Sequence, residues 1–286
     1  MDYFYLFFSV IFSSTSGIFG TFFNRRNEKS ADGAKLYNFL QLSAVSLIWI
    51  IMFAFDYSFD AAVLPYSVAF AVSFTLCDIG IIYALKYGPA SLTSLLLGLS
   101  LILTTVWGLI FWNAPVTVFV IIGIILVAAS IFLCLYTGKR EKKKISLKWL
   151  FFVSLAFFGN AACSIIQRTQ QIVFNGGYKT MLMAVATTLS AIACFVIYLL
   201  GDKRDSKMII KKSWVFPVAA GACNVFLNLF VMKLALSSLS PSFIYPVIGV
   251  GGLFVVLVFS FFVFKEKLRW WQWLGILLGA LAIAML

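Results

Sequence analysis

Long runs of apolar residues recur along the whole chain, separated by short segments rich in charged residues, Gly, Pro or Asn. Each run is about 20 residues long, which is enough for an α-helix to cross a hydrocarbon core of roughly 30 Å. Strands of a membrane barrel are shorter and alternate apolar with polar positions, so the pattern excludes them. The pattern predicts ten transmembrane helices, near residues 3–23, 36–55, 66–85, 90–112, 116–137, 149–167, 179–200, 214–236, 242–264 and 270–286.

The composition agrees with this pattern. Of the 286 residues, 63% are hydrophobic and only 11% are charged, whereas a soluble domain is nearer half apolar and a quarter charged. The first apolar run follows Met1 and Asp2 without a basic segment, so we interpret it as a membrane span and not as a cleaved signal. The sequence therefore predicts an all-α, multi-pass integral membrane protein.

The basic residues are distributed unevenly between the two sides of the predicted bundle. The connections after the first, third, fifth, seventh and ninth helices hold 4, 1, 6, 5 and 3 Lys or Arg, which is 19 of the 22 in the chain. Because basic loops stay in the cytoplasm, these connections are expected there and both termini outside. The net charge of +12 is then explained by topology and anionic lipid, so no nucleic-acid partner is expected.

The two halves of the chain share a weak internal repeat. Residues 84–91 (ALKYGPAS) align with 235–242 (ALSSLSPS), and 17–26 align with 159–168, each ending in Arg. Five helices per half is an odd number, so the halves would lie upside down relative to each other. Inverted repeats of this kind are a device of secondary transporters, with the substrate site at the repeat interface. The predicted domains are residues 1–140 and 141–286.

Three segments stand out when the halves are read in order: YALKYGPASLTSLLLG, MKLALSSLSPSFIYPVIG and FFVFKEKLRWWQWLGILLGALAI. Together they resemble the ten-span, EamA-like members of the drug/metabolite transporter superfamily. Glu266 matches an acidic residue of that family, whereas the equivalent turn at 113–115 (NAP) lacks one. The resemblance implies two inverted five-helix repeats around a central cavity, formed by the first four helices of each half, with the fifth helices peripheral.

Asp78 is the only acidic residue inside a predicted helix, and it lies about midway along the third. A carboxylate at the bilayer centre costs roughly 2.5–3.5 kcal/mol on insertion scales, so we expect Asp78 to face a cavity or a partner instead of lipid. In a cavity, proton binding and substrate binding would compete for this group. The alternative is a structural role, in which a hydrogen-bonded Asp78 holds helices together.

Other polar residues within the predicted helices are candidates for contact with a substrate. Asn224 and Asn228 are four residues apart and so share one helix face. The further candidates are Asn160, Gln41, Ser94 and Tyr245, with Pro246 as the expected site of a helix kink. Interhelical hydrogen bonding is the alternative for the amides, and simple packing is the alternative for the kink. Arg168 is expected to mark a membrane interface.

Several kinds of chemistry are not supported by the residues. The chain has no His, which removes His-dependent catalysis and the usual metal ligands. Its five Cys form no CxxC pair and lie in apolar runs, where Cys is usually a small buried hydrophobe. No P-loop is present, so ATP does not drive the protein directly. We expect no enzymatic activity, no cofactor and no bound metal.

These observations favour a secondary active transporter of a small polar or amphipathic metabolite, including amino acid-like compounds, that works by alternating access. Export fits the family resemblance, with proton coupling through Asp78 and a bacterial plasma membrane as the location. The expected partners are a small-molecule solute and membrane lipids, with a monomer or homodimer as the assembly. Two alternatives stay open. They are a carrier for a cationic, choline-like nutrient, and a lipid-handling or structural membrane subunit.

Overall fold

The computed structural model describes residues 1–27, 33–88, 90–112, 114–136, 146–201, 203–263 and 269–286. Within them, every one of the ten predicted ranges overlaps a long helix. The long helices are α1 (Asp2–Arg26), α2 (Gly33–Phe55), α3 (Leu64–Tyr87), α4 (Ala90–Phe111), α5 (Val118–Leu135), α6 (Leu147–Val173), α7 (Lys179–Leu199), α9 (Val215–Leu234), α10 (Pro241–Val263) and α11 (Trp270–Met285). The predicted repeat boundary at 140/141, Asn113 and Glu266 lie outside the described residues.

Not all of the helices are equally suited to crossing a membrane. In the described residues, α1, α2, α3, α6, α7, α9 and α10 are long and apolar enough to do so by length and composition, while the apolar stretches of α4, α5 and α11 are shorter. Large apolar side chains lie exposed along the bundle, including Phe7, Ile110, Phe158 and Leu277. An all-helical bundle with an apolar exterior is the arrangement expected of a multi-pass membrane protein.

Two short helices complete the described fold. Helix η1 (Ala61–Val63) leads into α3, and the Asp60 carboxylate caps it by accepting from the Ala62 N–H at 2.9 Å. Helix α8 (Ser206–Ser213) precedes α9 in a segment that the hydropathy pattern predicts as a loop. Ile209 of α8 is buried against Phe23 and Leu36, so this basic, amphipathic segment is attached to the bundle by its apolar face.

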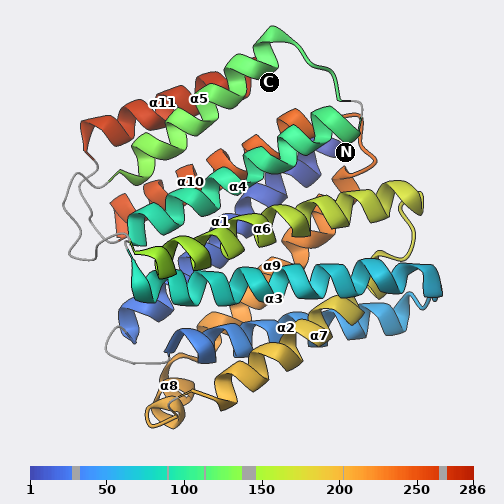
Figure 1. Ribbon diagram of the computed structural model, residues 1–286, viewed down its shortest axis with the longest axis vertical. Coiled ribbons are helices and arrows are strands. Elements are labelled where there is room, and N and C mark those ends of the chain that lie inside the picture. Colours follow the sequence, from blue (N-terminus) through green and yellow to red (C-terminus); the bar gives the residue numbers. More distant parts are fainter. Residues whose placement is uncertain (28–32, 89, 113, 137–145, 202, 264–268) are drawn as a thin grey trace.

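The helices pack as pairs drawn from the two halves of the chain. α3 packs along α6, α1 along α9, α2 along α7 and α5 along α11 (Figure 1). The α3–α6 contact is close because both helices place a glycine in it. A Cβ at Gly80 would lie 2.6 Å from the Ala156 nitrogen, and one at Gly159 would lie 2.7 Å from the Ser73 carbonyl oxygen. Small residues at the crossing therefore allow the two backbones to touch, as is common between membrane helices.

The α5–α11 pair lies at one edge of the bundle, away from α2 and α7 (Figure 1). The Ser130 hydroxyl donates to the Gly275 carbonyl at 2.7 Å, and the Gln272 amide donates to the Cys134 carbonyl at 3.0 Å. The pair's main contacts to other helices are with α4 and α10. This agrees with the peripheral position that the family resemblance implies for the fifth helices.

The two ends of the bundle differ in charge. At the first, here called the basic end, α1 and α3 end and α2 begins, which brings Arg25, Arg26, Lys35 and Lys86 to one side. At the opposite end, α1 begins and α9 ends, and the Asp2 carboxylate accepts from the Ser238 N–H and hydroxyl, both at 3.2 Å. In Figure 1 the N-terminus marks the opposite end, and α8 lies at the basic end.

Candidate functional site

A cavity of about 360 Å³ extends from the middle of the bundle to the basic end. Its size falls within the roughly 300–1,000 Å³ of typical ligand pockets. Asp78, Asn160, Asn224 and Gln41, four of the residues that the sequence singles out, lie on its wall. The other described lining residues are Ser16, Gly17, Gly20, Asn24, Ala34, Tyr37, Asn38, Leu42, Phe74, Cys77, Ile81, Ile82 and Leu85.

Helical periodicity explains why these residues share one surface. On α3, Phe74, Asp78, Ile81 and Leu85 recur at intervals of three or four residues and so lie on one face. The same spacing on α1 and α2 brings Gly20 and Tyr37 to the wall. The described wall comes from α1, α2, α3, α6 and α9. Helices α4, α7 and α10 supply no described lining residue, in contrast to the full four-helix contribution from each half that the resemblance implies.

Asp78 is in contact with the cavity and is partly exposed. Among the described residues, no hydrogen bond or ion pair to its carboxylate is found, and no Lys or Arg lines the cavity. A carboxylate that holds helices together would be expected to have a protein partner. The arrangement leaves both carboxylate oxygens available to a solute or to water.

Asn224 begins a row of amides that continues from the cavity towards the opposite end. The Asn228 amide donates to the Asn224 side-chain oxygen at 2.9 Å and to its backbone carbonyl at 2.8 Å. The Gln167 amide donates to the Asn228 side-chain oxygen at 2.6 Å. Asn228 is not among the described residues of the cavity wall. It connects Asn224 on α9 with Gln167 on α6 by hydrogen bonds.

Asn160 lies on the part of the cavity wall that α6 supplies, where α6 approaches α4. Its amide donates to the Ser100 hydroxyl at 2.6 Å. The side chain is therefore held in place by one hydrogen bond within the protein, and its second polar atom remains available on the cavity side. Gln41 on α2 also lines the cavity, and no hydrogen bond of its side chain is found in the described part of the chain.

Arg168 was expected at a membrane interface, and this expectation is wrong. Its side chain is only 8% exposed. The guanidinium carbon lies 5.2 Å from the centroid of the Trp112 ring, and the group is in hydrogen-bonding contact with the Tyr245 hydroxyl. Its Nε has no described partner. The hydropathy pattern ends the helix at residue 167, but α6 continues to Val173, so Arg168 is part of a helix inside the bundle.

Tyr245 contributes to this buried cluster and does not line the cavity in this structure. It is 3% exposed and lies in the first turns of α10, at the opposite end of the bundle. Pro246 follows it inside the continuous helix. Because proline has no backbone N–H, the Ser242 carbonyl lacks the helical hydrogen bond that it would otherwise accept from residue 246. Gln170 and Gln171, predicted as a loop, are also buried here, and both donate to the Gly177 carbonyl.

Ser94 is a predicted site residue that the structure places elsewhere. Thr93, Ser100 and Thr104 lie at helical spacing and are fully buried, so they define the inner face of α4. Ser94 follows Thr93 by one residue, which is about 100° around a helix, and it is exposed and absent from the cavity wall. The prediction that Ser94 contacts a substrate has no geometric support.

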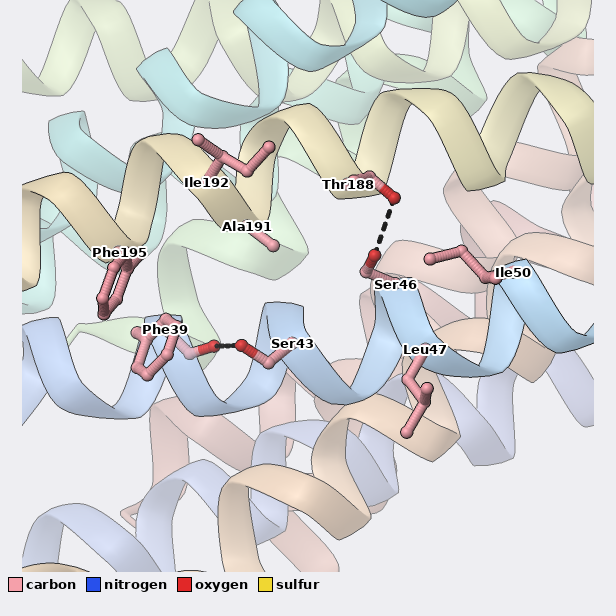
Figure 2. Close-up of a pocket in the computed structure, with 9 residues that line it drawn as sticks. All are labelled: Phe39, Ser43, Ser46, Leu47, Ile50, Thr188, Ala191, Ile192 and Phe195. Carbon is pink, nitrogen blue, oxygen red and sulfur yellow. Dashed lines mark hydrogen bonds between the residues drawn. The ribbon is translucent and has the colours of Figure 1, made fainter.

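A second hollow of about 390 Å³ lies on the outer surface between α2 and α7. Figure 2 shows Ser46 and Thr188 facing each other across it, 2.8 Å apart. The hydroxyls of Ser43 and Thr188 each donate to a backbone carbonyl of their own helix. Its remaining lining is apolar and includes Leu47, Ile50 and Ile192, which are exposed. Because its polar atoms are already paired, this groove offers a lipid-facing surface and not a polar site.

Comparison with known proteins agrees with this architecture. Residues 147–286 match the EamA-like transporter family, part of the drug/metabolite transporter superfamily, whose members are transporters. A solved structure described only as "Crystal structure of protein" is 11% identical and superposes with a TM-score of 0.75, covering 99% of this chain and 95% of that one. This likeness shows the fold alone. A search of curated proteins finds no match.

Proposed function

We propose that this chain, whose second half belongs to the EamA-like transporter family, is a secondary active transporter that moves a small polar or amphipathic solute by alternating access. The observation that carries the proposal is the partly exposed Asp78 on the wall of a cavity that opens at one end of an apolar helical bundle. A lipid-handling or structural subunit would not need a carboxylate and several amides around a hollow interior.

The pattern of helix contacts supports two related five-helix repeats. If α1 to α5 are exchanged with α6, α7, α9, α10 and α11 in that order, the α3–α6 contact becomes the α9–α1 contact. In the same way α2–α9 becomes α7–α3, and α1–α10 becomes α6–α4. The α2–α7, α4–α10 and α5–α11 contacts map onto themselves. The strongest contacts are therefore unchanged by this exchange, as a pseudo-two-fold axis between inverted repeats would produce. The weaker contact between α5 and α10 has no counterpart of similar size between α11 and α4.

Access from one side only is the second element of the proposal. The cavity reaches the basic end, where Asn24, Ala34 and Leu85 are exposed. Towards the opposite end, the amide row leads from Asn224 to Gln167, and the next residue is the buried Arg168. Arg168 follows Asn160 by eight residues, about 12 Å along a helix. We infer that the cluster of Arg168, Trp112 and Tyr245 closes this end, and that it separates when the solute leaves there.

We infer the direction of transport from the distribution of basic residues between the two ends of the bundle. Basic loops favour the cytoplasm, so the open cavity faces the cytoplasm and the cluster at Arg168 closes the outer side. Export of a cytoplasmic solute, amino acid-like compounds included, is the process that this arrangement serves. Uptake of a proton by Asp78 from outside would displace a solute held by the carboxylate and would couple export to proton entry.

The test is flux in proteoliposomes with a defined pH gradient. Counterflow of a radiolabelled solute from a metabolite panel is expected for the wild type, with a rate that changes when the gradient is reversed. Asp78→Asn is expected to abolish the response to the gradient, whereas Asp56→Asn, which alters an exposed acid outside the cavity, is expected to keep it. Flux that ignores both the gradient and the Asp78 substitution would remove Asp78 from the mechanism.

A further inference from the structure

The charge of the cavity wall restricts what it can hold. Asp78 is the only charged residue among the described lining residues, and the polar remainder consists of amides, Ser16, Tyr37 and Cys77. In a confined site with low dielectric constant, one uncompensated carboxylate repels anions and attracts cations far more strongly than it would in water. Arg168 does not offset it from within the cavity, because its guanidinium is held at Trp112 and Tyr245.

Two aromatic rings lie on the same wall. Phe74 is on α3, one helical turn before Asp78, and Tyr37 faces the cavity from α2. The Tyr37 ring packs against Phe23 with centroids 4.9 Å apart. Its hydroxyl approaches α1 so closely that a Cβ at Gly20 would lie 3.2 Å from it. Aromatic faces stabilise alkylated ammonium groups by cation–π attraction, and carboxylates supply the matching charge.

The amides add a polar contact on the far side of the cavity. Asn160 on α6 and Asn224 on α9 are each held by one hydrogen bond, to Ser100 and Asn228 respectively. Each retains a second polar atom for a ligand, as is typical of sites in which a few fixed polar groups orient a small molecule. These amides suit a hydroxyl or carbonyl on a solute whose positive end is at Asp78.

From this arrangement we propose that the cavity binds a small organic ammonium ion, with its cationic group between Asp78, Phe74 and Tyr37 and a polar oxygen towards Asn160 and Asn224. The inference names the substrate class of the transporter proposed above and so rests on that proposal. It also assigns Phe74 and Tyr37 as specificity-determining residues. Neutral and anionic solutes of the same shape would lose the attraction of the carboxylate.

The test compares two probes of nearly identical shape. Choline and 3,3-dimethylbutan-1-ol differ in that a carbon atom replaces the charged nitrogen, and binding of each to the purified full chain in nanodiscs is measured by calorimetry. We expect choline to bind at least about tenfold more tightly than the alcohol, since a contact to a charged group contributes roughly 1.5–3 kcal/mol. Equal affinity, or no binding of choline, would overturn the inference.

Variants locate the site. Asp78→Asn is expected to remove the preference for choline over the alcohol, and Phe74→Leu to weaken choline binding about threefold. Asp56→Asn, outside the cavity, is expected to leave both affinities unchanged. If Asp78→Asn does not fold, the comparison of the two probes on the wild type still decides the matter. Flux of a neutral or anionic solute, without binding of choline, would support the transport proposal and refute the ammonium site. Choline binding without any flux would support the ammonium site and refute the transport proposal.

Discussion

The guanidinium carbon of Arg168 lies 5.2 Å from the centroid of the Trp112 ring, although one residue belongs to α6 and the other follows α4. The Tyr245 hydroxyl, from α10, is in contact with the same guanidinium. Three segments that are far apart in the sequence are thereby joined around one buried cation. A group of this kind is costly to bury unless aromatic and hydrogen-bonding neighbours surround it.

Removing the Tyr245 hydroxyl should loosen this cluster. Tyr245→Phe keeps the ring but leaves the buried Arg168 with one partner fewer, and an unsatisfied buried donor costs roughly 1–3 kcal/mol. We expect a lower midpoint in thermal unfolding of the detergent-solubilised protein. Tyr136→Phe provides the control, because the Tyr136 side chain is 51% exposed. Equal stability of the two variants would show that the contact with Arg168 contributes nothing.

The amide row predicts energetic coupling between α6 and α9. Gln167→Leu and Asn228→Leu each remove one side of a 2.6 Å hydrogen bond and leave the atom on the other side without this partner. The double variant should therefore lose less stability than the sum of the single losses. Denaturant unfolding in mixed micelles is expected to give a coupling of roughly 0.6–1.7 kcal/mol, the range from average to largest for membrane hydrogen bonds. Strict additivity would mean that the two amides act independently.

The α3–α6 crossing should tolerate no added methyl group at Gly80. The nearest atoms to a Cβ there are the backbone nitrogen of Ala156 at 2.6 Å and the carbonyl oxygen of Phe152 at 2.7 Å. Backbone atoms can yield only if α6 moves as a whole, so Gly80→Ala should cost about 1–3 kcal/mol or more.

Gly17→Ala is the matched control for this substitution, because a Cβ at Gly17 would meet only the Val256 side chain at 3.7 Å, an ordinary contact. Size-exclusion profiles and thermal midpoints of the two variants check the prediction. If Gly80→Ala behaves like the wild type, the crossing of α3 and α6 has room for a methyl group at this position.

Substitutions of two polar residues that were predicted from the sequence as site residues should differ in their effect on solute flux. Asn160→Ala removes an amide from the cavity wall and is expected to lower solute flux roughly tenfold, the equivalent of one hydrogen bond of ~1.4 kcal/mol. Ser94→Ala changes an exposed position that does not line the cavity and should leave flux unchanged. Counterflow in proteoliposomes at equal protein density distinguishes them, and a loss caused by Ser94→Ala would contradict the placement of the cavity.

The ten helices were predictable because lipid imposes a requirement for long apolar runs that hydropathy detects directly. The same pattern failed at the end of α6, where Arg168, Gln170 and Gln171 were assigned to a loop although they are buried inside the bundle. Hydropathy alone cannot distinguish a polar residue in a loop from one that is buried and paired. The absence of Gly or Pro between residues 168 and 175 was the signal that the helix continues.

The candidate site was predictable in its polar members and not in its aromatic ones. Asp78, Asn160 and Asn224 stand out because a polar side chain in an apolar helix requires a reason. Tyr37 and Phe74 do not stand out, since 17% of the chain is aromatic, and only the folded arrangement shows which rings lie beside the carboxylate. Ser94 is exposed and does not line the cavity, because its position around α4 depends on a helical phase that a single hydroxyl does not reveal.

The edge position of α5 and α11 has a practical consequence for work on this protein. The pair supplies none of the described cavity residues and joins the remaining helices mainly through α4 and α10. A rigid fusion partner, a fluorophore or a crystallisation chaperone attached at the C-terminal end of α11 would therefore add mass or signal without obstructing the cavity.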